Sequence, residues 1–121
     1  MLRRVIESGK HCEVVIVGGG AGGAELALSM RHRTREELKR RGMDENLAKF
    51  TLVTRGTLMP SHAKRVRKTF LNIFAESGVD VIEGDGVVTA EQGKLTLESG
   101  RVVSADECIW CTGGTAQGWL R

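Results

Sequence analysis

The glycine-rich loop at residues 18–23, Gly-Gly-Gly-Ala-Gly-Gly, limits the fold of this chain more than any other feature. It directly follows a β-branched run at 13–17, Glu-Val-Val-Ile-Val, whose continuous apolar character predicts a strand buried on both faces of a parallel sheet. After the loop, Ala24, Ala27 and Leu28 recur at helical spacing. The loop is therefore expected to turn the chain from a buried strand into a helix that packs closely on the sheet.

The spacing of three glycines within this loop fits a phosphate-binding turn. Gly18 allows the tight turn, Gly20 lets the backbone approach a pyrophosphate, and Gly23 permits close packing of helix and strand. The helix that follows presents N–H groups and the positive end of its dipole to the phosphates. A glycine-rich turn without a ligand would need only one of these glycines. The loop predicts a Rossmann-type dinucleotide-binding domain, with pyrophosphate contacts from Gly18, Gly19, Gly20, Ala21, Gly22 and Gly23.

Two further helical segments are expected after the first helix. Residues 34–37, Thr-Arg-Glu-Glu, have the form of a capping box, which predicts a helix restart that ends at Gly42. Pro60 and Ser61 predict another helix start, with Ser61 as the N-cap. That helix runs to about Ser77 and ends at Gly78. Its apolar stripe is formed by Val66, Phe70, Ile73 and Phe74.

The remaining segments predict strands of two kinds. Residues 50–54 and 79–82 are expected to join the parallel sheet. Three short segments then alternate with turn signals, which is typical of an antiparallel meander. These segments are 86–89, 94–97 and 101–103, and a last strand covers 107–110. The predicted fold is α/β, a Rossmann-like parallel sheet with flanking helices and an antiparallel three-stranded β-meander.

Length, charge and cysteine content narrow the class of protein. The 121 residues suit a single domain, and a net charge of +3 is too weak to indicate a nucleic-acid partner. Six of the 18 basic residues fall between Arg31 and Arg41, which indicates a solvated helix face or, alternatively, a surface for anionic lipid or an acidic partner. No segment is long and apolar enough to span a membrane, and the N-terminus does not resemble a signal peptide. The three cysteines do not form a disulfide framework, which favours the cytoplasm.

The end of the second parallel strand leaves the choice of nucleotide open. Many NAD-binding domains carry a carboxylate here that holds the ribose 2′-hydroxyl. This chain has Val53-Thr54-Arg55 instead. Thr54 can hydrogen-bond a ribose hydroxyl, whereas Arg55 can either meet the 2′-phosphate of NADP or simply face solvent. NAD is slightly favoured, and NADP stays open.

No catalytic residue and no metal site is predicted. Cys108 and Cys111 match a C-x-x-C pattern, but they fall in a predicted strand, where positions three apart point to opposite faces. That geometry disfavours a dithiol pair, and no second pair or nearby histidine completes a metal site. His11 and Cys12 lack partners close in sequence. His32 and His62 are interpreted as surface groups.

From Gly18 to Ala27 the sequence resembles the pyridine nucleotide-disulfide oxidoreductase superfamily. It looks most like the NADH-binding domain of type II NADH dehydrogenases, and it also resembles the flavoprotein module fused to selenide, water dikinase in some bacteria. The resemblance implies that Glu25 lies near the nicotinamide end of the cofactor. The alternative is an exposed glutamate favoured by the helix dipole. The likeness continues at 50–56, 58–60, 78–81 and 105–113.

The resemblance implies an NAD(P)H-binding domain of an FAD-dependent oxidoreductase, in which hydride passes from nicotinamide to flavin. Thr112, Gly113 and Gly114 would approach the cofactor, Gly113 and Gly114 through their backbone. By the same resemblance, we expect the family's two flavin-binding segments and its C-terminal interface or membrane-binding domain to lie outside this sequence. We therefore expect residues 1–12 to be an N-terminal extension and 105–121 to lead toward an absent FAD domain. FAD would bind only in the full-length parent protein. One alternative is that this parent is a peripheral protein on the inner face of the membrane.

Two other functions are kept open. In the first, the chain is a nucleotide-sensing or regulatory module fused to, or partnering, a selenide, water dikinase. In the second, the glycine loop binds FAD itself, although the strand at 79–82 and the meander resemble the nicotinamide domain more closely. On the favoured interpretation, the domain alone binds nucleotide without turnover.

Overall fold

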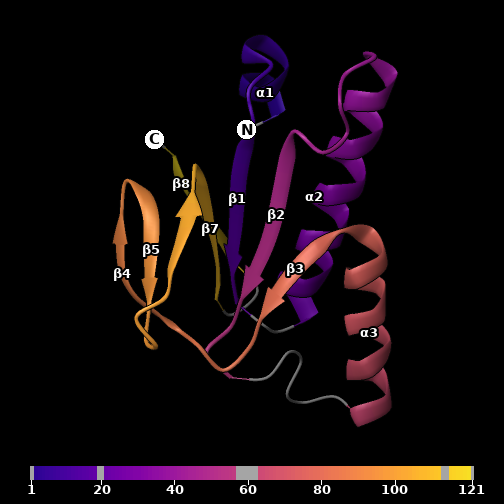
Figure 1. Ribbon diagram of the computed structural model, residues 1–121. Helices are drawn as coiled ribbons and strands as arrows, with labels where there is room; N and C mark the ends of the chain where they lie inside the picture. The colour runs from indigo at the N-terminus through magenta and orange to yellow at the C-terminus, as the bar shows by residue number, and fades with distance from the viewer. Residues whose placement is uncertain (1, 19–20, 57–62, 113–114, 121) are drawn as a thin grey trace.

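The computed structural model describes residues 2–18, 21–56, 63–112 and 115–120, and it places one main sheet between helices and a smaller sheet (Figure 1). Within the described residues the main sheet has five strands in the order β3-β2-β1-β7-β8. The first four strands in that order are parallel, and β8 pairs with β7 antiparallel. The strands are β1 (Cys12–Val17), β2 (Ala48–Val53), β3 (Val79–Ile82), β7 (Glu107–Thr112) and β8 (Thr115–Leu120).

The order of the strands creates a switch point beside β1. The chain moves from β1 to β2 and then to β3 on one side, and it returns to β7 on the other side. The register pairs Val17 with Val53 and with Trp110, so the carboxyl ends of these parallel strands lie together. In open α/β sheets, ligands bind outside the carboxyl ends of the strands at such a point.

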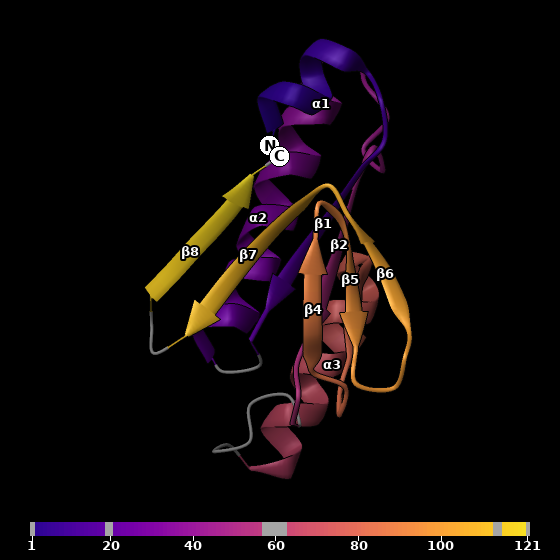
Figure 2. The ribbon, with the colours of Figure 1, turned by 90° about the vertical axis from the view of Figure 1, so that its left-hand side faces the viewer.

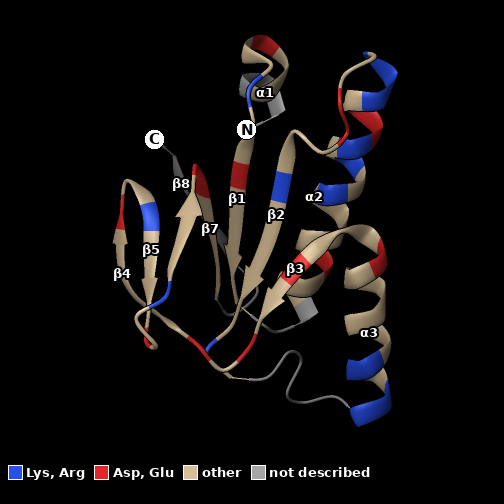
Figure 3. Ribbon diagram, viewed as in Figure 1, with Lys and Arg blue, Asp and Glu red and all other residues tan. Residues whose placement is uncertain are grey.

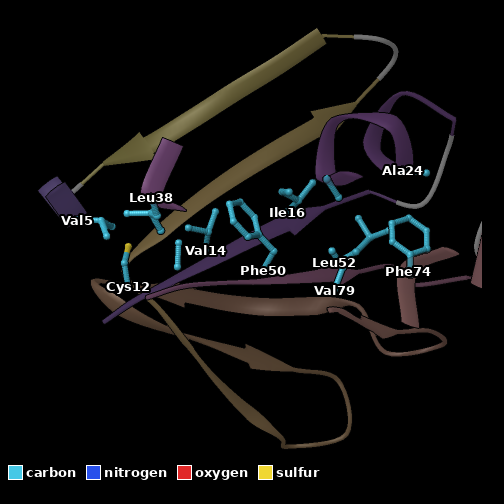
Figure 4. Close-up of a cluster of buried hydrophobic side chains, with 12 residues drawn as sticks. Val5, Cys12, Val14, Ile16, Ala24, Leu38, Phe50, Leu52, Phe74 and Val79 are labelled. Atoms are coloured by element: carbon cyan, nitrogen blue, oxygen red, sulfur yellow. The ribbon is translucent and has the colours of Figure 1, made fainter. Parts of the chain in front are cut away.

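Helices α2 (Ala21–Arg40) and α3 (Lys64–Ser77) cover one face of the main sheet (Figure 1). The core on this face joins strand residues to helix residues, and Figure 4 shows these side chains meeting along the sheet. It includes the fully buried Ile16, Phe50, Leu52 and Phe74. A short helix, α1 (Leu2–Ser8), adds Val5 to the same cluster. Among the described helices, none is long and apolar enough to cross a membrane.

A separate three-stranded sheet covers the opposite face. Its strands are β4 (Val87–Glu91), β5 (Gly93–Leu97) and β6 (Val102–Ala105), in the order β4-β5-β6. Both pairings are antiparallel. Leu95 and Leu97 are buried against Val15, Val53 and Cys108 of the main sheet. Figure 2 shows this meander in front of β1 and β2, with α3 behind. The predicted fold class is confirmed.

Two predicted helix starts are wrong. The capping box at 34–37 does not interrupt α2, because Thr34 is 2% exposed and held in the packed helix. Packing therefore outweighs the local capping signal. Helix α3 begins at Lys64, with Ala63 at the N-cap and no side-chain capping hydrogen bond. The expected N-cap Ser61 and its neighbour Pro60 lie outside the described residues.

Other predicted boundaries are confirmed or adjusted. Gly42 and Gly78 follow α2 and α3 with φ values of 71° and 78°, in the left-handed region that favours glycine at helix ends. Strand β2 begins at Ala48 and ends at Val53, so Thr54 lies just past it. Ile73 is 37% exposed, and its predicted place in the buried stripe of α3 is wrong. Neither α1 nor β8 is expected from the sequence.

The basic segment of α2 is only partly a solvated face. Figure 3 shows Lys and Arg along the C-terminal half of this helix, where Glu37 pairs with Arg40 and Arg41. Arg31, however, is 6% exposed and points into the protein. The prediction that all these residues face solvent is therefore wrong at Arg31. Its long side chain donates hydrogen bonds to the backbone carbonyls of Ser77, Glu45 and Ala48.

Candidate functional site

The carboxyl ends of β1, β2 and β7 border a hollow of about 310 Å³ at the switch point. The predicted site residues Gly18, Thr54 and Arg55 all line it, although they come from separate parts of the sequence. A larger hollow of about 570 Å³ lies between the main sheet and the meander, and none of the predicted site residues lines it. The hollow at the switch point is therefore the candidate site.

Gly18 directly follows β1 in a conformation that requires glycine. Its φ is 134°, and its N–H donates a hydrogen bond to the carbonyl oxygen of Val53 at 2.9 Å. A Cβ at this position would overlap the carbonyl oxygen of Cys111 and lie 3.2 Å from the Cβ of Cys111. Strand β7 therefore passes directly against the end of β1. A side chain at Gly18 would force these strands apart.

Gly23 lies in the first turn of α2 and has equally little room. A Cβ there would overlap the carbonyl oxygen of Gly18 and lie 3.1 Å from the carbonyl carbon of Gly18. The helix thus begins in direct contact with the strand before it. A Cβ at Gly22 would meet no atom within 4 Å, so this neighbouring glycine is not needed for packing. Gly19 and Gly20 lie outside the described residues, and Ala21 is the first residue of α2.

Thr54 is fixed by its backbone at the end of β2. Its N–H donates to the carbonyl of Ile82 at 2.9 Å, and its carbonyl accepts from the N–H of Asp85 at 3.2 Å. The residue is 7% exposed. These bonds hold Thr54 at the rim of the hollow. Its side chain brings a hydroxyl, rather than a carboxylate, to this position.

Arg55 is neither free in solvent nor buried. Its side chain is 73% exposed, and its Nε donates to Oε1 of Glu98 at 3.1 Å. The same carboxylate oxygen accepts the N–H of Gly86 at 2.8 Å. A Cβ at Gly86 would lie 2.5 Å from Nε of Arg55, so glycine leaves space for the ion pair. Glu98 could not be predicted as the partner of Arg55 because the two residues are 43 positions apart in the sequence. A glycine at position 86 is a sequence feature that reflects the space this pair needs.

The remaining predicted contacts are Glu25, Thr112, Gly113 and Gly114. Glu25 is exposed on α2, beyond the first turn of the helix. Thr112 ends β7 and pairs with Thr115 through the backbone of the two strands. Gly113 and Gly114 lie outside the described residues, as do residues 58–60. The structure therefore positions Glu25 and the backbone of Thr112, and it leaves their roles toward a cofactor as predictions.

The cysteines of β7 face opposite sides of the sheet, as predicted. Cys108 packs in the cluster under the meander, and Cys111 packs against the helix-side cluster. Cys108 and Cys111 are free thiols. Burial raises the pKa of both thiols in β7, that of Cys108 to about 11, which keeps them protonated near neutral pH. A redox pair between them is therefore disfavoured.

Neither His11 nor His32 lines the candidate hollow. The ring of His11 contacts Oε2 of Glu13, which corrects the expectation that His11 has no partner close in sequence. His32 is exposed on α2, and His62 lies outside the described residues. In the part of the chain that the structure describes, no three His, Cys, Asp or Glu side chains gather as metal ligands.

Known proteins share this sequence pattern and fold. The family model described as pyridine nucleotide-disulphide oxidoreductase matches residues 3–119. The type II NADH:quinone oxidoreductase of Haemophilus influenzae is 31% identical over 104 residues, which is 83% of this chain and 23% of that relative.

Solved structures show the same fold at lower identity. The structure of NDH2 from Plasmodium falciparum in complex with NADH matches with a TM-score of 0.81 and 19% identity, over 93% of this chain and 26% of that one. Reduced CoADR-RHD from Bacillus anthracis matches with a TM-score of 0.63 and 24% identity, over 95% of this chain and 18% of that one. The chain thus spans about a quarter or less of each protein that it resembles.

Proposed function

This chain belongs to the pyridine nucleotide-disulphide oxidoreductase family, and on that premise we propose that it supplies the NAD(P)H-binding site of an FAD-dependent oxidoreductase of the NADH dehydrogenase type. The observation that supports this best is the close contact of Gly18 and Gly23 at the switch point of the sheet. Side chains are excluded there, and a helix N-terminus follows at once. Such a place lets backbone N–H groups bind a pyrophosphate.

We assign the residues at this edge to the pyrophosphate, the nicotinamide and the adenosine of a dinucleotide in turn. The loop at 18–23 would hold the pyrophosphate through backbone N–H groups at the start of α2. Glu25, Thr112, Gly113 and Gly114 would lie toward the nicotinamide. When bound beside a flavin, NAD(P)H supplies a hydride that the flavin accepts, and the protein contributes position and electrostatics. This division of labour needs no catalytic side chain from the chain itself.

The adenosine end would meet Thr54 and Arg55. The hydroxyl of Thr54 would bond a ribose hydroxyl at the rim of the hollow. Arg55 would attract a 2′-phosphate, but Glu98 already accepts a hydrogen bond from its Nε and brings a negative charge to the same place. A carboxylate there repels a phosphate. We therefore favour NAD over NADP.

The rest of the reaction belongs to the whole protein. The chain spans 23% of the Haemophilus relative, so FAD binding, the electron acceptor and turnover are proposals for a longer molecule. For this chain we propose nucleotide binding without turnover. We also propose a cytoplasmic location, because free thiols at Cys108 and Cys111 suit a reducing compartment.

A titration of the purified chain with NADH, NADPH and FAD tests the proposal directly. We expect calorimetry to detect NADH binding, weaker NADPH binding and no FAD binding. Free ADP-ribose should compete with NADH, because it carries the pyrophosphate and both riboses without the nicotinamide. Absence of heat with all three cofactors at millimolar concentration would contradict the proposal. Tight FAD binding would replace it with a flavin site in the same loop.

A further inference from the structure

Cys111 lies where β7 passes against the start of the glycine loop. Its neighbour Trp110 pairs with Val17, the last residue of β1. A Cβ at Gly18 would lie 3.2 Å from the Cβ of Cys111, and a Cβ at Gly23 would lie 3.7 Å from the same atom. The side chain of Cys111 therefore begins beside both the first and the last glycine of the motif.

The surroundings of Cys111 connect the core with the candidate site. The side chain packs against the helix-side core but is only partly buried. It also lines the hollow that Gly18 and Thr54 border. Because Gly18 and Gly23 have no side chains, the Cβ of Cys111 is the nearest side-chain atom to the Cβ positions of both glycines within the described residues. Cys111 therefore packs against Gly18, just after β1, and against Gly23, in the first turn of α2.

We propose that Cys111 is a positioning residue, whose small side chain sets the position of the first turn of α2 and so determines the affinity for the dinucleotide. This inference rests on the proposed function. Protein interiors are close-packed, so an added methylene displaces its neighbours. A larger side chain at Cys111 would push Gly23 and the N-terminus of α2 away from β1. The backbone N–H groups proposed to bind the pyrophosphate would then no longer point at it, although the sheet could still form.

Cys108 provides a matched comparison on the same strand. It is buried beneath the meander, on the face away from α2. A larger side chain at Cys108 should destabilise the protein without moving the glycine loop. Cys108→Val therefore separates a general loss of stability from a specific loss of affinity for the nucleotide.

The test measures NADH affinity and unfolding temperature for Cys111→Leu and Cys108→Val. We expect Cys111→Leu to bind NADH roughly tenfold more weakly than the unaltered chain does, as an overpacking strain of ordinary size allows. Cys108→Val should lose stability and keep its affinity. Equal affinity of Cys111→Leu and the unaltered chain would overturn the inference, and so would a matching loss in Cys108→Val. If the unaltered chain itself binds no NADH, the proposed function fails instead.

Thiol alkylation gives a second measurement that needs no variant. Iodoacetamide is attacked by the thiolate sulfur, so a C–S bond forms, the C–I bond breaks and iodide leaves, while the thiol proton passes to buffer. Mass spectrometry follows each cysteine with and without saturating NADH. We expect NADH to slow alkylation of Cys111 more than that of Cys108 or Cys12, because the nucleotide would fix the turn above Cys111. Equal slowing at all cysteines, or none at Cys111, would overturn the inference.

Discussion

The first turn of α2 touches the end of β1 through Gly23 and Gly18. A methyl group on Gly23 would overlap the carbonyl oxygen of Gly18 and lie 3.1 Å from its carbonyl carbon. The atoms in the way are backbone atoms, which cannot rotate aside as a side chain does. The contact therefore fixes how close the helix N-terminus comes to the candidate site.

Replacing Gly23 with alanine is expected to weaken both packing and nucleotide binding. The methyl group forces α2 away from β1, which should lower the free energy of unfolding by about 2 kcal/mol, as overpacking typically does. Urea unfolding and NADH titration measure the two effects. Gly22→Ala is the control for stability, because a Cβ there meets nothing within 4 Å and alanine favours a helix by about 0.5–1 kcal/mol. Equal unfolding free energies for the two variants would contradict the packing argument.

Arg31 is expected to hold three segments of the chain together. Its Nε–H donates to the carbonyl of Ser77 at 2.9 Å, at the end of α3. Its other nitrogens donate to the carbonyls of Glu45 and Ala48 and to Oδ1 of Asn46. Burial lowers the pKa of this guanidinium, with the nearby charge of Arg35 acting in the same direction, but it stays charged near neutral pH. Loss of these bonds takes a charged donor away from three backbone carbonyls and from the amide oxygen of Asn46.

We therefore expect Arg31→Met to lower the free energy of unfolding by about 2–4 kcal/mol, measured by urea unfolding. Arg31→Lys should recover little, because one ammonium cannot reach carbonyls in several directions. Arg33→Met changes an exposed arginine on the same helix and should stay within about 0.5 kcal/mol. The assignment fails if the Arg31 and Arg33 variants unfold at the same urea concentration.

The sequence predicted those parts of the fold that depend on neighbouring residues. The β-branched run before Gly18, the strand at 79–82 and the turn glycines of the meander each carry their own local signal. Gly42 and Gly78 likewise mark helix ends through a left-handed conformation that glycine adopts most easily. These elements are confirmed because tertiary packing and local preference agree.

The features that were missed depend on contacts between distant residues. Thr34 carries a capping signal that packing within α2 overrides, and Arg31 belongs to a basic segment but finds its acceptors as far away as Ser77. The pair of Arg55 with Glu98 joins β2 to the turn after β5. Helix α1 and strand β8 lack strong patterns of their own. The role of Glu25 and the link to selenide, water dikinase stay predictions.

The buried thiol of Cys108 is expected to make stability depend on alkaline pH. Burial raises its pKa to about 11, whereas an unfolded thiol titrates at about 8.5. The folded state then binds more protons between these values, so stability is complete below the lower value and falls as pH rises. We expect the stability advantage of the unaltered chain over Cys108→Ala to shrink by about 2 kcal/mol between about pH 7 and about pH 10.

Urea unfolding at the two pH values measures this effect. Val15→Ala is the control, because Val15 is buried in the same cluster and carries no titrating group. Its stability difference from the unaltered chain should not change with pH. A constant difference for Cys108→Ala as well would show that Cys108 keeps an ordinary pKa in the folded protein.

The ion pair of Arg55 and Glu98 is expected to tune the choice between NADPH and NADH. Glu98 accepts a hydrogen bond from Nε of Arg55 at 3.1 Å, so its removal frees the guanidinium and removes a negative charge. Exposed pairs of this kind are weak, and we expect Glu98→Gln to tighten NADPH binding by only about two- to fivefold, with NADH unchanged. Arg55→Gln in the same chain should abolish the gain. Glu91→Gln, which alters an exposed glutamate paired with Lys94, should leave both affinities as they are. If Glu98→Gln changed NADH and NADPH binding equally, Arg55 would not meet the 2′-phosphate, and Thr54 alone would define the adenosine end.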